Sequence, residues 1–398
     1  MSSFTTTSRM PGFFALSIEE RRTYLQNVCP KLSGENLRTL DQSLSLHEAD
    51  LMSENVVGTF SLPFSVAANF MIDGKSVLVP MVTEEPSIVA ASSKMAKIVA
   101  SVGGFNTKIN APLQKGQVQL FELADIDKAL QLFIEHQEEI IHELNQLCPN
   151  MLRRGGGVVR IESRVLSSAK LGPILLIEPL VNVVDAMGAN IVNHLMEALG
   201  EKLKELIGGT VVLRILSNLC DERLAHAQCR IPVQLLSTDK THDFGEYIAK
   251  KMIAAHTLAE IDPYRACTHN KGIMNGIDAV ALATGNDFRA LEAGAHAYAA
   301  RSGTYQALTS ITFEQNNKNL LATLTIPLAI GVVGGICRTH RGVKVAHKLL
   351  GDYALNSTKL SSVMVSVGLA QCLAALLALS SDGIQKGHMK LHNKKSQF

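Results

Sequence analysis

The stretch DPYRACTHNKGIMNGIDAVALATGND, residues 262–287, gathers arginine, histidine, lysine, asparagine and aspartate side chains around small apolar residues. Within it, core-type side chains recur at steps of three and four residues, which is the period of one face of an α-helix; they are Ile273, Ile277, Val280, Ala281 and Thr284. Thr268 or Asn270 would cap the start of this helix, and Gly285 would end it. The pattern predicts a core helix with charged groups concentrated at its two ends.

If this helix is straight, its two charged ends are too far apart to act on one small substrate. A helical rise of about 1.5 Å per residue separates Lys271 from Asp287 by about 24 Å. Either the chain folds back within the stretch, or the two ends serve sites shared between subunits. A plain capped core helix with solvated ends is the alternative interpretation.

The composition describes an ordinary folded protein. The chain has 398 residues, which is enough for two or three domains. Of these residues, 46% are apolar and 19% are charged. Its formal net charge of +2 indicates neither a nucleic-acid partner nor a membrane surface. The N-terminus lacks the pattern of a secretory signal, and the longest apolar run, 324–337, is too short to span a bilayer. We therefore expect a soluble, cytoplasmic protein.

The cysteines carry no metal or disulfide signature. They are seven in number, widely spaced and without a CxxC pair. This distribution favours reduced thiols in a cytosolic protein and indicates no metal site.

The segment from residue 113 to 221 alternates strand and helix patterns in an orderly way. We expect strands at 117–122, 157–166, 173–184 and 210–217, and helices at 126–147 and 189–207. This βαββαβ order is that of the ferredoxin-like arrangement, in which two helices cover one face of an antiparallel sheet. The predicted fold class is therefore α+β: a large mixed α/β domain, formed by 1–112 and 222–380, with a ferredoxin-like domain inserted at 113–221 and a short tail at 381–398.

The flanking segments predict the elements of the large domain. Before the insert we expect short helices within 18–51, strand and turn at 54–70, a strand at 76–82 and a helix at 87–104 that Pro86 starts. After it we expect a strand at 229–236, a helix at 244–257, a strand with a glycine-rich turn at 319–335 and a buried helix at 361–380.

The sequence DAMGAN, residues 185–190, lies between an expected strand and an expected helix. A chain that turns at a glycine into a helix presents free backbone N–H groups and the positive end of the helix dipole, which suits a phosphate. The motif is not GxGxxG and the unit is not a parallel βαβ, so it predicts no Rossmann site. A turn in which Asp185 caps the helix is an equally good interpretation.

Several single residues have side chains that could act in catalysis, but their sequence neighbours do not show whether they do. Glu84 and Glu85 precede a helix, where acidic residues usually serve only the helix dipole. His388, in the sequence Gly-His-Met, is a candidate proton donor. Cys267 is a candidate nucleophile for thioester hydrolysis, but no base and orienting group are spaced to activate it.

Taken in chain order, the motifs of this sequence resemble those of the HMG-CoA reductases, specifically the bacterial class II type. They are ENVVGTFSLP, VPMVTEEPSIVAA, DAMGAN, RILSNL, DPYRACTHNKGIMNGIDAVALATGND, GVVGG, GLAQ and GHMKLH, and they span nearly the whole chain. The resemblance implies reduction of 3-hydroxy-3-methylglutaryl-CoA to mevalonate and free CoA by two hydride transfers, or the reverse reaction, in mevalonate and isoprenoid metabolism.

The resemblance implies four catalytic groups: Glu85 of TEEPS, Lys271, Asp287 of ATGND and His388 of GHM. Lys271 would stabilise the oxyanion that forms as hydride reaches the thioester carbonyl. Asp287 would keep Lys271 protonated and linked to Glu85, whose pKa the cluster would raise so that it gives up a proton near neutral pH. His388 would protonate the departing CoA thiolate.

The same resemblance implies the binding residues and the partner. The implied substrate contacts are Ser87, Asn218, Arg265, Asn275 and Gln371, and the implied nicotinamide cofactor site is Asp185, Met187, Gly188, Ala189 and Asn190. Relatives form homodimers whose active site lies at the subunit interface. A shared site agrees with the separation of Lys271 and Asp287.

The sequence departs from the family pattern in two places. Cys148 stands where an NADH-using relative has an aspartate able to bind the adenosine ribose, and Arg153 and Arg154 follow it. A 2′-phosphate would not be repelled there, so we expect NADPH, rather than NADH, as the preferred cofactor. The chain also ends ten residues past His388, where relatives continue into a helical flap. A CoA- or nucleotide-binding homologue with weakened turnover is therefore the alternative to an active reductase.

Overall fold

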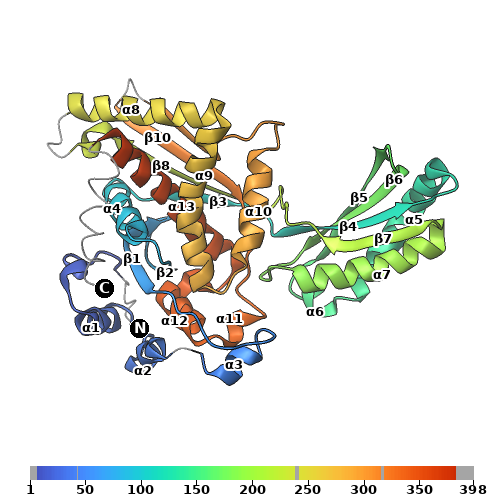
Figure 1. Cartoon of the computed structure of the whole chain (residues 1–398), viewed down its shortest axis with the longest axis horizontal. Coiled ribbons are helices and arrows are strands. Elements are labelled where there is room, and N and C mark those ends of the chain that lie inside the picture. The colour runs from blue at the N-terminus through green and yellow to red at the C-terminus, as the bar shows by residue number, and fades with distance from the viewer. Residues whose placement is uncertain (1–6, 43, 238–241, 315–317, 382–398) are drawn as a thin grey trace.

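The computed structural model describes residues 7–42, 44–237, 242–314 and 318–381. Most helices and strands form a large body, from which four strands and their helices extend as a smaller one (Figure 1). The chain leaves the large body once, at β4, and returns to it once, after β7.

The smaller body is an antiparallel four-stranded sheet with two long helices packed on it. Its elements are β4 (Leu113–Phe121), α5 (Ile126–Gln146), α6 (Pro149–Leu152), β5 (Gly157–Ser168), β6 (Gly172–Asn182), α7 (Ala189–Ile207) and β7 (Thr210–Leu216). The antiparallel strand order β5-β6-β4-β7 is that of a ferredoxin-like unit, so the predicted βαββαβ alternation is confirmed. Apolar side chains of α5 and α7, such as Phe133 and Leu199, form one buried core with Val118 and Ile177 of the sheet.

The large body contains a second antiparallel sheet and a hairpin. The sheet has the order β3-β8-β10-β9 and comprises β3 (Asn106–Ile109), β8 (Leu224–Pro232), β9 (Thr309–Glu314) and β10 (Asn319–Pro327); the hairpin is β1 (Phe64–Ile72) with β2 (Lys75–Val82). In β10, alternate residues from Leu320 to Ile326 are buried, because successive side chains of a strand point to opposite faces.

Helices pack around this sheet and the hairpin. The longer ones are α4 (Ile88–Ala100), α8 (His242–Ile261), α9 (Pro263–Ala283), α10 (Phe288–Ala299), α12 (Arg341–Leu350) and α13 (Ser357–Ser380); the short ones are α1 (Ile18–Val28), α2 (Gly34–Arg38), α3 (Leu46–Asp50) and α11 (Ile336–Thr339). Single 3₁₀ turns occur at Phe13–Ala15, Thr39–Asp41, Val233–Leu236 and Gly351–Ala354.

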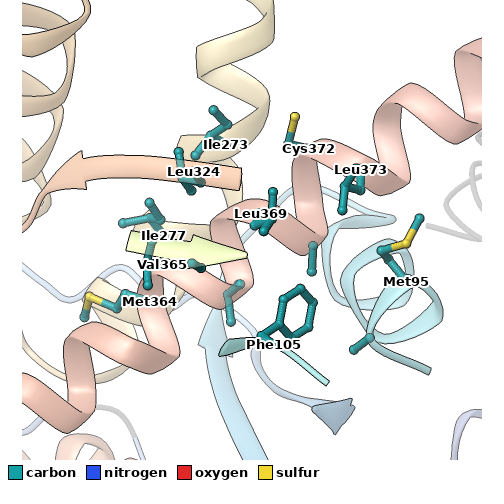
Figure 2. Close-up of a cluster of buried hydrophobic side chains, with 14 of the residues drawn as sticks. Met95, Phe105, Ile273, Ile277, Leu324, Met364, Val365, Leu369, Cys372 and Leu373 are labelled. Carbon is teal, nitrogen blue, oxygen red and sulfur yellow. The ribbon is translucent and has the colours of Figure 1, made fainter. Parts of the chain in front are cut away.

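The helix α13 is the centre of the large body. Figure 2 shows its side chains Val365 and Leu369 among those of Ile273 and Ile277 of α9, with Met95 of α4 nearby. Among the described residues, α13 is the one helix long and apolar enough to cross a membrane, and 83% of its most apolar stretch is buried inside the protein.

Two glycines let α9 and α13 pack closely. A Cβ atom on Gly276 of α9 would lie 3.0 Å from Val367 Cγ1, 3.1 Å from Gln371 Cβ and 3.2 Å from the Val367 carbonyl oxygen. A Cβ atom on Gly368 of α13 would lie 2.9 Å from Ile277 Cδ1. The close approach brings Gln371 against α9, the helix that carries Lys271.

Several predicted boundaries differ from the structure. The helix α9 begins at Pro263, earlier than predicted, because Asp262 caps it by accepting the backbone N–H of Arg265 at 2.9 Å. Pro86 does not start α4, whose N-cap is Ser87. The strand β8 begins at Leu224 rather than 229. The strands β3 and β9 and the helices α10 and α12 were not predicted.

The contact between α9 and α13 gives a stability prediction. Gly276→Leu should lower the free energy of unfolding by about 1–3 kcal/mol, because the added side chain overpacks the interface with Val367. Gly272→Leu lies on the same helix, and a Cβ atom there would have no neighbouring atom within 4 Å. It should instead be neutral or stabilising by up to about 1 kcal/mol through helix propensity. Thermal and urea unfolding of both variants tests this; equal effects at the two positions would contradict it.

Candidate active site

A cavity of about 420 Å³ lies between the start of α4, one face of α9 and the last turns of α13. It collects residues that are far apart in the sequence. The predicted site residues that line it are Glu85, Ser87, Arg265, Lys271, Asn275 and Gln371. The structure therefore brings together most of the predicted substrate contacts and two of the predicted catalytic groups.

An ion pair between Lys271 and Glu85 marks this cavity. Lys271 Nζ lies 3.0 Å from Glu85 Oε2, although the residues are 186 positions apart. The two side chains are 59% and 38% exposed, and exposed pairs contribute only about 0–1 kcal/mol to stability. The pair therefore matters for the charges that it places at the cavity more than for the fold.

Two polar atoms at the cavity are left without partners. Ser87 Oγ and Gln371 Oε1 are buried and have no hydrogen-bond partner among the described residues. Ser87 also has a φ of 82°, a left-handed conformation that is costly for a residue with a Cβ. An unsatisfied buried polar group costs about 1–3 kcal/mol. Both features are typical of a site that a polar ligand completes.

Buried histidines lie beside the cavity and are not proton donors. His269 Nε2 lies 2.6 Å from Thr309 Oγ1 and 3.4 Å from Cys372 Sγ. Burial, together with the charges of His256 and Arg265, lowers the pKa of His269 to about 3, so the ring is neutral. Burial raises the pKa of the Cys372 thiol to about 12. These groups pack and hydrogen-bond under the cavity without supplying charge.

Asp287 does not join the Lys271–Glu85 pair within one chain. The helix α9 continues without a break to Ala283, and Asp287 caps the next helix, accepting the backbone N–H groups of Arg289 and Ala290 at 3.1 and 3.2 Å. Burial opposes its ionisation, but these bonds and the Arg289 side chain outweigh burial, so the pKa of Asp287 lies below its ordinary value. The sequence left open whether the chain folds back within residues 262–287. The structure shows that it does not, because α9 is continuous to Ala283.

One predicted substrate contact lies away from the cavity, and one predicted catalytic residue is outside the part of the chain that the structure describes. Asn218 is exposed and follows β7, where its carbonyl oxygen lies against Gly294 of α10. His388 lies outside the described residues. The expectation that Asn218 contacts the same ligand as Arg265 is therefore not met within a single chain.

A pair of carboxyl groups, which was not predicted, lies between α9 and α10. Burial and then the hydrogen bond and charge of Glu292 raise the pKa of Asp278 to about 8, so its carboxyl is largely protonated at neutral pH. A hydrogen bond from His296, 2.5 Å away, lowers the pKa of Glu292, and the charge of Lys271 acts in the same direction. Asp278 follows Lys271 by seven residues, the spacing of one helix face, and this is the signal that could have identified it.

The turn at 185–190 presents uncapped backbone N–H groups. Gly188, with a φ of 110°, is the N-cap of α7, and it provides no side chain to cap the helix. Asp185 does not cap α7; its carboxylate accepts the backbone N–H of Ser357 at the start of α13, at 3.1 Å. The interpretation of Asp185 as the cap of the following helix is therefore wrong, and the free N–H groups remain able to bind an anion.

Cys148 is turned into the protein. Its side chain is 4% exposed and lies against the last turn of α5, and burial raises the pKa of its thiol. The thiol offers no contact to a bound ribose. Arg153 and Arg154 beyond it are exposed. Within the described ranges, no group of three or more His, Cys, Asp or Glu side chains is placed to hold a metal ion.

Known proteins resemble this chain over nearly its whole length. Residues 17–393 match the sequence model of the family described as hydroxymethylglutaryl-coenzyme A reductase. The 3-hydroxy-3-methylglutaryl-coenzyme A reductase of Archaeoglobus fulgidus is 44% identical over 387 residues, which cover 97% of this chain and 86% of the relative. A probable enzyme of the same name from Borreliella burgdorferi is 35% identical, over 86% of this chain and 77% of the relative.

Solved structures agree with the sequence relatives. A 3-hydroxy-3-methylglutaryl-coenzyme A reductase from Streptococcus pneumoniae superposes with a TM-score of 0.89 at 41% identity, covering 97% of this chain and 90% of that one. A class II enzyme of the same species, described as bound to NADPH in open conformations, gives a TM-score of 0.88 at 40% identity, covering 93% and 99%. The chain therefore belongs to the hydroxymethylglutaryl-coenzyme A reductase family and matches its class II members.

Proposed function

We propose that the cavity between α4, α9 and α13 is where this oxidoreductase reduces 3-hydroxy-3-methylglutaryl-CoA to mevalonate and free CoA, or runs the reverse reaction. The observation that carries the proposal is the Lys271–Glu85 pair beside the partnerless oxygens of Ser87 and Gln371. The named relatives favour an active reductase over a homologue with weakened turnover, because they are reductases by name.

Lys271 and Glu85 would handle the reacting carbonyl. A fixed ammonium at the carbonyl oxygen stabilises the negative charge that appears there when hydride arrives, and such preorganised charge is often the largest catalytic contribution. Glu85 Oε2 holds the ammonium in place through their 3.0 Å contact and can exchange a proton with the alkoxide oxygen. His388 would protonate the CoA thiolate.

The rest of the cavity suits the substrate. Arg265 offers a planar pair of donors that fits a carboxylate or phosphate. Ser87, Asn275 and Gln371 supply hydroxyl and amide groups that can hydrogen-bond the acyl part.

We assign nicotinamide cofactor binding to the ferredoxin-like unit, residues 113–221. The N–H groups at the start of α7 would hold a phosphate, with Asp185, Met187, Gly188, Ala189 and Asn190 forming the turn around the cofactor. The cofactor supplies the hydride. A solved class II relative, described as bound to NADPH, supports this class of cofactor.

We further propose a homodimer in which each active site is shared. Gly331 N donates to Asn286 Oδ1 at 2.8 Å, and a Cβ on Gly331 would lie 2.5 Å from Met187 N. The cofactor turn therefore lies near the Asp287 end of α9, whereas Lys271 lies 12 residues, about 18 Å, before the last helical residue, Ala283. Within one chain, the cofactor turn and the Lys271–Glu85 pair therefore lie toward opposite ends of this part of α9. A second subunit would place its Asp287 and cofactor turn at the Lys271–Glu85 pair of the first.

The reaction itself is tested by stoichiometry. Purified protein supplied with HMG-CoA and NADPH should oxidise two cofactors for each free thiol released, measured by absorbance and a thiol reagent. Lys271→Ala should lower kcat by about 10²–10³-fold, because an oxyanion-stabilising charge is lost. Lys202→Ala, which removes a lysine paired with Glu143 in the smaller body, should leave kcat unchanged. Thiol release without cofactor oxidation would indicate a hydrolase and overturn the assignment.

The shared site is tested by mixing inactive subunits. Lys271→Ala and Asp287→Ala should each be inactive alone. Co-expressed, they should recover about a quarter of the parent activity, because a mixed symmetric dimer regains one intact site out of two and half of the dimers are mixed. If both residues instead act within one chain, no mixed dimer contains an intact site. Absence of recovery in purified mixed dimers would therefore contradict the shared site.

The cofactor preference is tested by initial rates. We expect higher kcat/KM with NADPH than with NADH. Replacing Arg153 and Arg154 together by glutamate should lower kcat/KM for NADPH by about tenfold or more, because the loss of one charge-assisted hydrogen bond has about this effect. The kcat/KM for NADH should change little. Lys170→Glu, in the exposed β5–β6 turn, controls for a charge reversal elsewhere on the same unit, at half the change in net charge. A strong preference for NADH in the parent would contradict the proposal.

A further inference from the structure

Arg223 is a buried arginine at the junction of the two bodies. It lies in the link between β7 and β8, and only 4% of it is exposed. Its guanidinium donates hydrogen bonds to the carbonyl oxygens of Met187, at 3.0 Å, of Ala186, at 3.2 Å, and of Ile330. Two of the three acceptors thus belong to the turn at 185–190, and the third belongs to the large body.

The charge of Arg223 has no carboxylate partner among the described residues. Burial lowers its pKa to about 10, and the one opposing influence is the nearby Cys220. Buried charges in proteins are normally paired, since desolvation is costly. Here backbone carbonyls alone satisfy the cation, and the planar five-donor guanidinium is the side chain that can reach several of them at fixed angles.

Other contacts hold the same turn in the same place. Val332 N donates to the Asp185 carbonyl oxygen at 2.9 Å, and Ser357 Oγ donates to the Val184 carbonyl oxygen at 2.8 Å. Val184 has a φ of 54°, which is rare for a β-branched residue and persists only where the surroundings impose it. The turn is therefore constrained from several sides.

The large-body side of this junction leads to α9. Ile330 and Gly331 follow β10, and Gly331 N donates to Asn286 Oδ1 next to Asp287. Arg223 itself accepts the backbone N–H of Leu328 at 3.1 Å through its carbonyl oxygen. Arg223 thus connects the turn directly to the segment that fixes the Asp287 end of α9.

We propose that Arg223 is a positioning residue for hydride transfer: it sets the place of the 185–190 turn relative to Asp287, and so the distance and angle at which the cofactor meets the substrate carbonyl. This inference rests on the proposed cofactor role of the turn. Misplacement of a reacting group by about 1 Å through a remote substitution can cost about 100-fold in rate.

The test compares Arg223→Met with two controls in the smaller body. Arg164→Met removes an arginine paired with Glu178 on β5, and Leu199→Ala weakens the α7 core away from the turn. For each protein we would measure the thermal midpoint, KM for NADPH and HMG-CoA, and the primary isotope effect with NADPH deuterated at the transferred position. We expect kcat to fall by up to about 100-fold and the isotope effect to rise in Arg223→Met, with KM for HMG-CoA unchanged. Neither control should change the isotope effect.

Gly331→Ala tests the same inference by displacing the turn from the large body, and it replaces Arg223→Met in the test if that variant does not fold. Its new Cβ would meet Met187 N at 2.5 Å and push the turn without removing Arg223, so the isotope effect should rise here too. Unchanged isotope effects and rates in these variants, with a thermal midpoint lowered as in Leu199→Ala, would show Arg223 to be merely structural and overturn the inference. Failure of the unsubstituted protein to oxidise NADPH with HMG-CoA would instead refute the proposed function and, with it, the role of Arg223.

Discussion

The unbroken length of α9 is the constraint on which the arrangement of the site depends. An α-helix is a rigid rod because each backbone N–H is bonded four residues back, and α9 keeps this pattern from Pro263 to Ala283. The glycine contact with α13 then fixes its rotation, so that Arg265, Lys271 and Asn275 line one cavity. The same rigidity holds Asp287 away from that cavity.

The two ends of α9 differ in how their polar groups are satisfied. At the cavity, Ser87 Oγ and Gln371 Oε1 are buried without partners, and Ser87 is conformationally strained. At the other end, carbonyl groups of the 185–190 turn are held by Arg223 and its neighbours. Unsatisfied groups suit a surface that exchanges its ligand, whereas a turn that presents its N–H groups to a phosphate must itself be fixed. Strained and partnerless groups therefore lie at the proposed substrate end of α9, and well-supported groups lie at its proposed cofactor end.

The proposed shared active site would reconcile these two ends with one reaction. In a twofold symmetric dimer the same surface meets itself, so the Asp287 end of one subunit can approach the Lys271 end of the other twice. Such a site would couple activity to association, since an isolated chain holds both halves but cannot bring them together. Within one chain, the charge of Lys271 also contributes to the lowered pKa of Glu292.

Sequence patterns by themselves determined the features that depend on local chain geometry. The βαββαβ order and the end of α9 two residues before Gly285 follow from periodicity and glycine placement, and the set of chemically active residues follows from the resemblance of the motifs to a known family. Only the tertiary structure decided which of those residues meet. The pairing of Lys271 with Glu85, the burial of Cys148, the carboxyl pair Asp278–Glu292 and the three carbonyls around Arg223 join segments that are distant in the chain or belong to different elements. Such contacts are set by packing between elements, and neither helix period nor residue type encodes which surfaces will face each other.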